Sequence, residues 1–169
     1  MKKLNFALLC VLMFGLVNAG LADTDSDTFQ VTANVAAGCT VSSEDLNFGA
    51  YGGLATSDAV DASATVTYAC TMGTNGVIRM DQGLYQGGGS TDASPLRQMA
   101  GSTTGYYLRY DLYSDASRTT VWGNTTATGV AVTGDGTEIT SQKVYGRIVA
   151  GQAMPIGSYV DTVTVSIDF

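Results

Sequence analysis

The sequence contains no histidine. Its absence removes Ser-His-Asp and Cys-His catalysis, His-ligated zinc and the usual general base near neutral pH. Only three cysteines are present, and two of them cannot complete a zinc site alone. We therefore expect no enzyme activity, no metal and no cofactor. A histidine-free hydrolase would need a carboxylate pair in a cleft, and nothing in the sequence brings Asp81 and Asp111 together for that purpose.

Charged residues are also scarce, at 14% of the chain, and most of them are acidic. Without Lys2 and Lys3, six basic side chains face fifteen acidic ones, a net charge of −9 (6 − 15). That charge repels phosphate backbones and anionic lipids, so we expect no nucleic-acid partner. A surface with few charges does little to keep copies of the chain apart, which fits a protein that sits against copies of itself.

Long hydrophobic runs are limited to the N-terminus. The run from Leu4 to Val17 follows two lysines and is too short to span a bilayer, which is typical of a signal peptide. We expect residues 1–22 to be removed by cleavage after Ala22, with cleavage after Ala19 as the alternative. An uncleaved membrane anchor is the competing interpretation.

Two cysteines remain after the signal peptide, Cys39 and Cys70. An even number in an exported chain indicates one disulfide. It would close a loop of 31 positions (70 − 39) and contribute about 3–4 kcal/mol in the chain-entropy model. Two buried free thiols are the alternative.

Helical periodicity is hard to find after residue 22, whereas apolar and polar residues alternate in runs separated by turn residues. This pattern predicts an all-β sandwich or barrel. The predicted strands are residues 28–35, 46–53, 62–70, 77–80, 106–113, 143–149 and 158–169.

The two terminal segments of the predicted mature chain stand out. The first strand places Phe29, Val31, Ala33 and Val35 on one face and is tethered by residues 36–38. The last strand runs to the end of the chain, with Asp161 as the single polar member of its apolar face; the apolar members are Tyr159, Val163, Val165, Ile167 and Phe169.

A sandwich that lacks its final strand leaves a groove with unpaired backbone groups, which a strand from another chain can complete. The segment 28–35 has the right form to be that donor. It could equally be the first strand of an ordinary sandwich, since alternation does not separate pairing within the chain from pairing between chains.

Several motifs, in their order and spacing, resemble the spore coat protein U domain family, which includes pilus subunits of archaic chaperone–usher systems. The matching residues are Gly38-Cys39-Thr40-Val41, Leu46-Asn47-Phe48-Gly49-Ala50-Tyr51, Val66-Thr67-Tyr68-Ala69-Cys70, Tyr107-Leu108-Arg109-Tyr110-Asp111-Leu112-Tyr113, Trp122-Gly123, Val144-Tyr145-Gly146-Arg147-Ile148 and the segment 155–165.

The resemblance implies an incomplete immunoglobulin-like sandwich over residues 37–169, completed by a donor strand from a neighbouring chain. It implies a donor extension at 23–36, the disulfide Cys39–Cys70 and a groove edge formed by the C-terminal strand. Its expected partners are a periplasmic chaperone, an outer-membrane usher, and other copies or related pilus subunits. The chain would pass through the periplasm to the cell surface, in a pilus that supports adhesion or biofilm formation, or in a spore coat.

A function from another class stays open, that of a secreted carbohydrate-binding β-sandwich. Tyrosines could stack on sugars, although tyrosines at strand spacing more often serve the core and its rim. The candidates are Tyr106, Tyr107, Tyr110 and Tyr113. A stable monomer that binds glycans would favour this function over assembly.

Overall fold

The computed structural model describes residues 23–136 and 139–169, and the predicted signal peptide lies outside the described residues. The chain divides into two units, residues 1–34 and 35–169. No described strand begins before Cys39. Phe29, Val31 and Val35 have 86%, 84% and 82% of their surface exposed. In the part of the chain described, no helix is long and apolar enough to cross a membrane.

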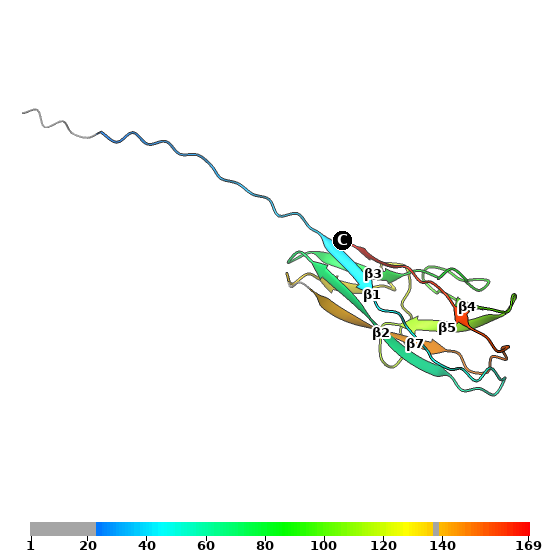
Figure 1. Cartoon of the computed structure of the whole chain (residues 1–169). Helices are drawn as coiled ribbons and strands as arrows, with labels where there is room; N and C mark the ends of the chain where they lie inside the picture. The colour runs from blue at the N-terminus through cyan, green and yellow to red at the C-terminus, as the bar shows by residue number, and fades with distance from the viewer. Residues whose placement is uncertain (1–22, 137–138) are drawn as a thin grey trace, which may run out of the picture. The chain divides into compact units, whose positions relative to one another are not determined.

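The second unit consists of two antiparallel sheets (Figure 1). The larger sheet has the order β1-β2-β7-β5-β4-β8, with β1 (Cys39–Ser43), β2 (Val60–Cys70), β4 (Arg97–Gly101), β5 (Tyr107–Tyr113), β7 (Thr140–Ile148) and β8 (Tyr159–Val160). The smaller sheet has the order β6-β3-β9, with β3 (Asn75–Met80), β6 (Val130–Thr133) and β9 (Val165–Asp168). The described residues contain no helix, so the all-β prediction is confirmed.

Alternation along the strands places the core between the two sheets. In β5, Leu108, Tyr110 and Leu112 point inward and are buried. The largest core side chain is Trp122, which is fully buried and donates a hydrogen bond from its ring N–H to the Ile78 carbonyl at 2.9 Å. The buried core cluster comprises Val66, Ile78, Met80, Leu108, Tyr110, Leu112, Trp122, Val132, Val144 and Ile148.

A disulfide joins Cys39 to Cys70, as the sequence predicts. The two residues face each other in the first register pair of β1 and β2. Thr71 follows directly and fixes the chain just before β1: its amide donates to the Gly38 carbonyl at 2.9 Å and its hydroxyl to the Ala36 carbonyl at 3.3 Å. The domain therefore begins at a firmly held point.

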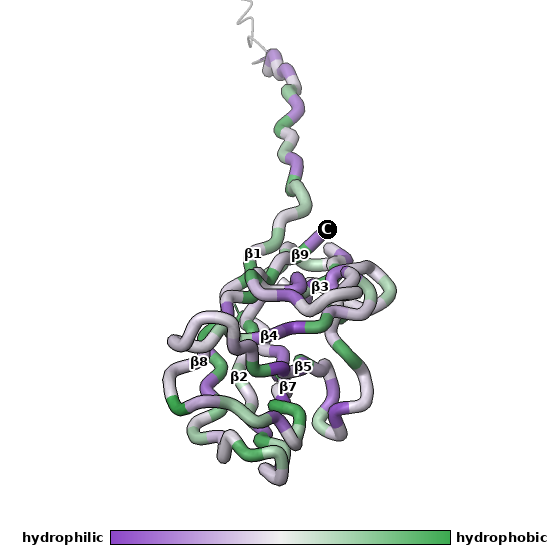
Figure 2. The backbone as a smooth tube through the Cα atoms, turned by 90° about the vertical axis from the view of Figure 1, so that its right-hand side faces the viewer, coloured by the Kyte–Doolittle hydropathy of each residue, from purple (hydrophilic) through white to green (hydrophobic). Residues whose placement is uncertain are grey.

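Three differences from the predicted strands matter for the site. The segment 46–53 carries no strand, and β1, β4 and β6 form where none is predicted. The predicted C-terminal strand divides into β8, which pairs with β4 in the larger sheet, and β9, which pairs with β3 in the smaller one. Figure 2 shows β9 beside β3 at the end of the domain where the C-terminus lies. The segment 161–164 thus crosses from one sheet to the other.

Candidate functional site

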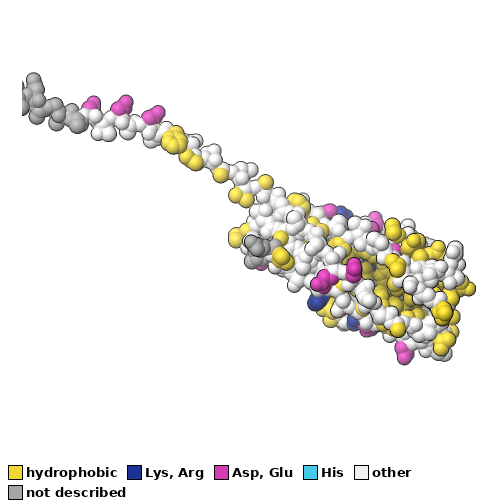
Figure 3. All heavy atoms as spheres, viewed as in Figure 1, with side chains coloured by type: hydrophobic (Ala, Val, Ile, Leu, Met, Phe, Trp, Pro, Cys, Tyr) yellow, Lys and Arg dark blue, Asp and Glu magenta, His cyan; other side chains and the backbone are white. Residues whose placement is uncertain are grey.

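A groove of about 1010 Å³ opens on one face of the domain. Two segments far apart in the sequence form its walls: the first wall is residues 43–53, and the second wall is residues 154–165. Its floor is apolar and is made by Ala64, Val66, Met80, Met99, Leu108, Tyr110, Leu112, Val144 and Ile148. The space-filling view shows this hollow lined by hydrophobic side chains (Figure 3).

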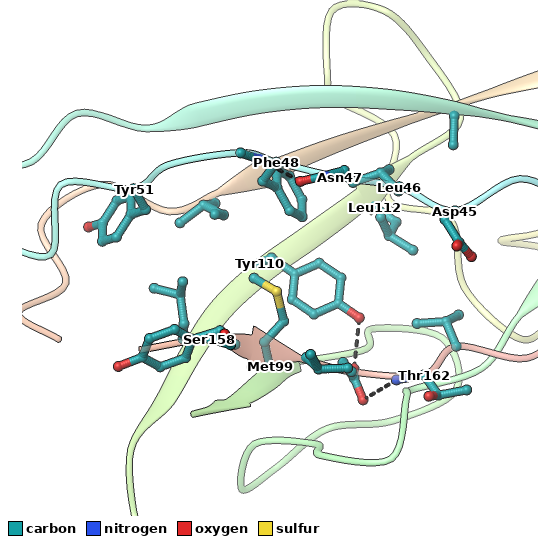
Figure 4. A pocket seen from close by; sticks show the side chains of 18 of the residues that line it. Asp45, Leu46, Asn47, Phe48, Tyr51, Met99, Tyr110, Leu112, Ser158 and Thr162 are labelled. Carbon is teal, nitrogen blue, oxygen red and sulfur yellow. Dashed lines mark hydrogen bonds between the residues drawn. The ribbon is translucent and has the colours of Figure 1, made fainter. Parts of the chain in front are cut away.

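The first wall leans over the floor because one position of β7 has no side chain. A Cβ at Gly146 would lie 2.8 Å from the Phe48 ring and 3.0 Å from a Leu46 methyl. This close approach places the Phe48 and Tyr110 rings in an edge-to-face pair, with the ring centroids 5.9 Å apart. Leu46, Phe48 and Tyr51 line the same wall in the close-up view (Figure 4).

The second wall contains the crossover between the sheets. On one side, the carbonyls of Thr162 and Thr164 accept hydrogen bonds from the amides of Leu84 (3.2 Å) and Asp81 (3.0 Å). Successive residues of an extended chain direct their main-chain groups to opposite sides. The main-chain groups of the alternate residues Asp161 and Val163 therefore face away from Leu84 and Asp81, toward the groove. Neither residue bonds to another main-chain group within the described residues.

The first wall has an open main-chain edge as well. Its last main-chain bond to β2 runs from the Glu44 amide to the Thr65 carbonyl, at 2.9 Å. Over the described chain, residues 45–52 then form no hydrogen bond between main-chain groups. Apart from the Gly49 amide, which donates to the Asn47 side-chain oxygen at 2.8 Å, the groove thus offers main-chain groups without main-chain partners on both sides of an apolar floor. That arrangement can accept one extended strand, whose main chain pairs with both walls and whose alternate side chains enter the floor.

A carboxylate holds the second wall to the floor. Asp161 accepts a hydrogen bond from the Tyr110 hydroxyl at 2.7 Å, drawn in Figure 4. Its other oxygen accepts from the amides of Leu84 (2.9 Å), Thr162 (2.8 Å) and Tyr85 (3.3 Å). Burial, reinforced by the Asp161 carboxylate, holds the pKa of Tyr110 well above its usual value, so its hydroxyl stays protonated as a donor.

A buried arginine supports the same region from below. Arg97 is fully buried and lies opposite Tyr110 in the pairing of β4 with β5. Its guanidinium donates to the carbonyls of Asp81 (2.8 Å), Met80 (3.0 Å) and Trp122 (2.8 Å). Burial lowers the pKa of Arg97. Because two of its partners are the carbonyls of Met80 and Asp81, at and just past the end of β3, Arg97 fixes the start of the loop that contacts the second wall.

The structure separates the predicted groove residues into two groups. Tyr159, Val163 and Val165 line the groove. Ile167 packs against the core and Phe169 is 61% exposed, and neither lines the groove. Sequence reasoning missed the network of Arg97, Tyr110 and Asp161. The one available signal was the polar residue at 161 in an otherwise apolar row.

The fold and the groove together define a sandwich with an open place for one strand. A model of the Spore Coat Protein U domain matches residues 25–166. Protein U of Myxococcus xanthus is 38% identical over 156 residues, which cover 88% of this chain and 87% of that protein. The chain belongs to the Spore Coat Protein U domain family, and the resemblance found in its sequence is confirmed.

A solved structure shows the same architecture. It is the pre-assembly complex of the chaperone CsuC with the tip adhesion subunit CsuE, from archaic chaperone–usher Csu pili of Acinetobacter baumannii. The match has a TM-score of 0.52 and 25% identity, and covers 80% of this chain but 40% of that one. With the two antiparallel sheets, this likeness confirms the predicted immunoglobulin-like fold.

Proposed function

We propose that this protein is a structural subunit of a surface pilus of the archaic chaperone–usher type, assembled by donor-strand exchange. The segment 28–35 of one copy fills the groove of the next, with Phe29, Val31, Ala33 and Val35 directed into its floor. The observation that carries the proposal is the groove itself, because both of its walls present unpaired main-chain groups above an apolar floor.

The chemistry of the two parts agrees. An eight-residue strand is about 26 Å long and presents four side chains on one face, which suits the apolar floor of the groove. Phe29, Val31 and Val35 are exposed in the free segment. Burial of each of these side chains in the groove would contribute about 1.5–3 kcal/mol to the stability of the assembly. Main-chain hydrogen bonds add about 0.5–1.5 kcal/mol apiece. Part of this gain offsets the ordering of the segment, so a groove formed beforehand favours assembly.

The partners follow from the same geometry. An exported subunit with an open groove risks aggregation, and a periplasmic chaperone that covers the groove removes that risk. The solved relative in a chaperone complex supports this role, and an outer-membrane usher would then polymerise the subunits at the cell surface. Such a fibre would support adhesion or biofilm formation.

The test replaces Val31 and Val35 with Asp. Loss of two buried valines removes at least about 3 kcal/mol, which weakens assembly more than about 100-fold. The double variant is expected to give a folded domain with an intact disulfide and no polymers by size-exclusion chromatography and electron microscopy. The matched control is Thr32→Asp with Asn34→Asp, which adds the same charge to the opposite face and should still polymerise. Fibres formed equally by both double variants would refute the donor role.

A spore coat is the second candidate setting. The family's name and the 38% identity to Protein U favour it. The same groove and donor segment would operate there, since strand exchange joins copies whatever the final assembly. Immunogold labelling of intact cells and spores with an antibody to the folded domain distinguishes the two settings.

A further inference from the structure

The second wall has an unusual position in the fold. Between β8 and β9 the segment 161–164 belongs to neither sheet, and one of its sides borders the groove. Exposed apolar surface favours collapse, so an empty groove draws Val163 toward Phe48 and Leu46 across the gap. A wall that moves in this way would close the space for an incoming strand. Something must therefore hold it in place.

Two carboxylates tie this segment to the loop 81–85. Asp81 accepts hydrogen bonds from the amides of Gly83 and Thr164, both at 2.9 Å. Asp161 accepts from three amides and from the Tyr110 hydroxyl. Gly83 has a φ of +77°, and a Cβ there would lie 2.2 Å from the Asp161 carboxylate, so the loop closes directly over that group.

Asp161 differs from Asp81 in reaching the floor. Its bond to Tyr110 is the only side-chain hydrogen bond found, among the described residues, between the second wall and β5. Tyr110 is 5% exposed and packs against Phe48 of the first wall. The Tyr110 hydroxyl therefore links the position of the second wall to the Tyr110 ring, which contacts the first wall.

We propose that Asp161, acting through Tyr110, is a positioning residue that keeps the groove at the width of one strand before the donor arrives. The inference rests on the proposed function, and it assigns a role in the speed of strand entry. Removing the Tyr110 hydroxyl lets the wall move inward and reduces the fraction of molecules that can receive a strand. Apparent affinity falls in proportion to that fraction, through slower association. Dissociation from the filled groove changes little, because the donor itself then holds the walls apart.

The experiment uses the whole mature chain with Val31→Asp and Val35→Asp, so that its own segment does not occupy a neighbour. The probe is a fluorescent peptide with the native sequence of residues 25–37, and anisotropy gives its association and dissociation rates. Tyr110→Phe is expected to slow association about tenfold and to change dissociation less than about threefold. Asp161→Asn keeps the size but replaces one carboxylate oxygen with an NH2 group, so it cannot accept from the three amides and from the Tyr110 hydroxyl at the same time, and it is expected to slow association at least as much.

Ile78→Val is the control, because it shortens a fully buried core side chain that does not line the groove. Its association rate should equal that of the parent. If Tyr110→Phe associates as fast as the parent, or no more slowly than Ile78→Val, the positioning role is refuted while the strand-accepting function stands. If the parent itself does not bind the peptide, the proposed function fails, and the inference fails with it.

Discussion

Gly146 offers a sharp test of how the groove is built. It lies within β7, between Ala62 of β2 and Leu112 of β5, and its missing side chain leaves the space that Leu46 and Phe48 occupy. Replacing it with alanine puts a methyl group 2.8–3.0 Å from those two side chains. The main chain there does not need glycine for its conformation, since Gly146 is not among the residues with positive φ.

The expected magnitude follows from two opposing effects. Overpacking costs about 1–3 kcal/mol, because the ring or the wall must shift. Alanine in the middle of a strand recovers about 0.5–1 kcal/mol relative to glycine. The free energy of unfolding should therefore fall by about 1–2 kcal/mol, and the first wall should move outward from β7.

Urea unfolding followed by tryptophan fluorescence measures this change. Trp122 is the single tryptophan of the chain and is fully buried, so its emission reports on the core. The midpoint should fall by on the order of 1 M for a slope of about 1–3 kcal/mol/M. Gly88→Ala is the matched control: a Cβ there meets nothing within 4 Å, and the midpoint should stay or rise slightly. Equal midpoints for the two variants would show that Leu46 and Phe48 are not held against β7.

Two further outcomes are expected. Replacing Cys39 and Cys70 together with serine should lower the free energy of unfolding by about 2–4 kcal/mol, and an unchanged urea midpoint would contradict this. Hydrogen bonds from Ser117, Thr120 and Thr119 hold the pKa of Asp115 well below its ordinary value of 3.8. Its contribution is thus present above about pH 4 and lost as the pH falls through the lower folded-state pKa. Asp115→Asn should be less stable than the parent at pH 7 and lose less stability between about pH 5 and pH 2; parallel curves would refute this.

Much of the sandwich could be predicted from local alternation. The long strands β2, β5 and β7 could be predicted from the sequence because apolar and polar residues alternate through most of their length. β4 was missed because Arg97 takes an inward position that an apolar residue normally fills. Its buried charge is tolerated only through the carbonyls of Met80, Asp81 and Trp122, which are distant in the sequence.

The groove was predictable in outline and not in detail. An apolar C-terminal strand suggested an open edge, and Tyr159, Val163 and Val165 do line the groove. The division of that strand between two sheets depends on the loop 81–85, which no local pattern connects to Asp161.

The segment 28–35 shows why alternation alone does not make a strand. Its side chains alternate, but a strand also requires a main-chain partner, and the described strands begin only at Cys39.

The register of the disulfide has a mechanical consequence. A pull applied through the N-terminal segment enters the domain at Gly38 and reaches the covalent link between Cys39 and Cys70 at the very first pair of β1 and β2. Tension then bypasses β1 and passes into β2, which is the longest of the described strands and is paired along most of its length with β7. The ladder between β1 and β2 cannot be unzipped one hydrogen bond at a time from its loaded end. A domain tethered in this manner resists being unravelled by the segment that joins it to whatever it holds.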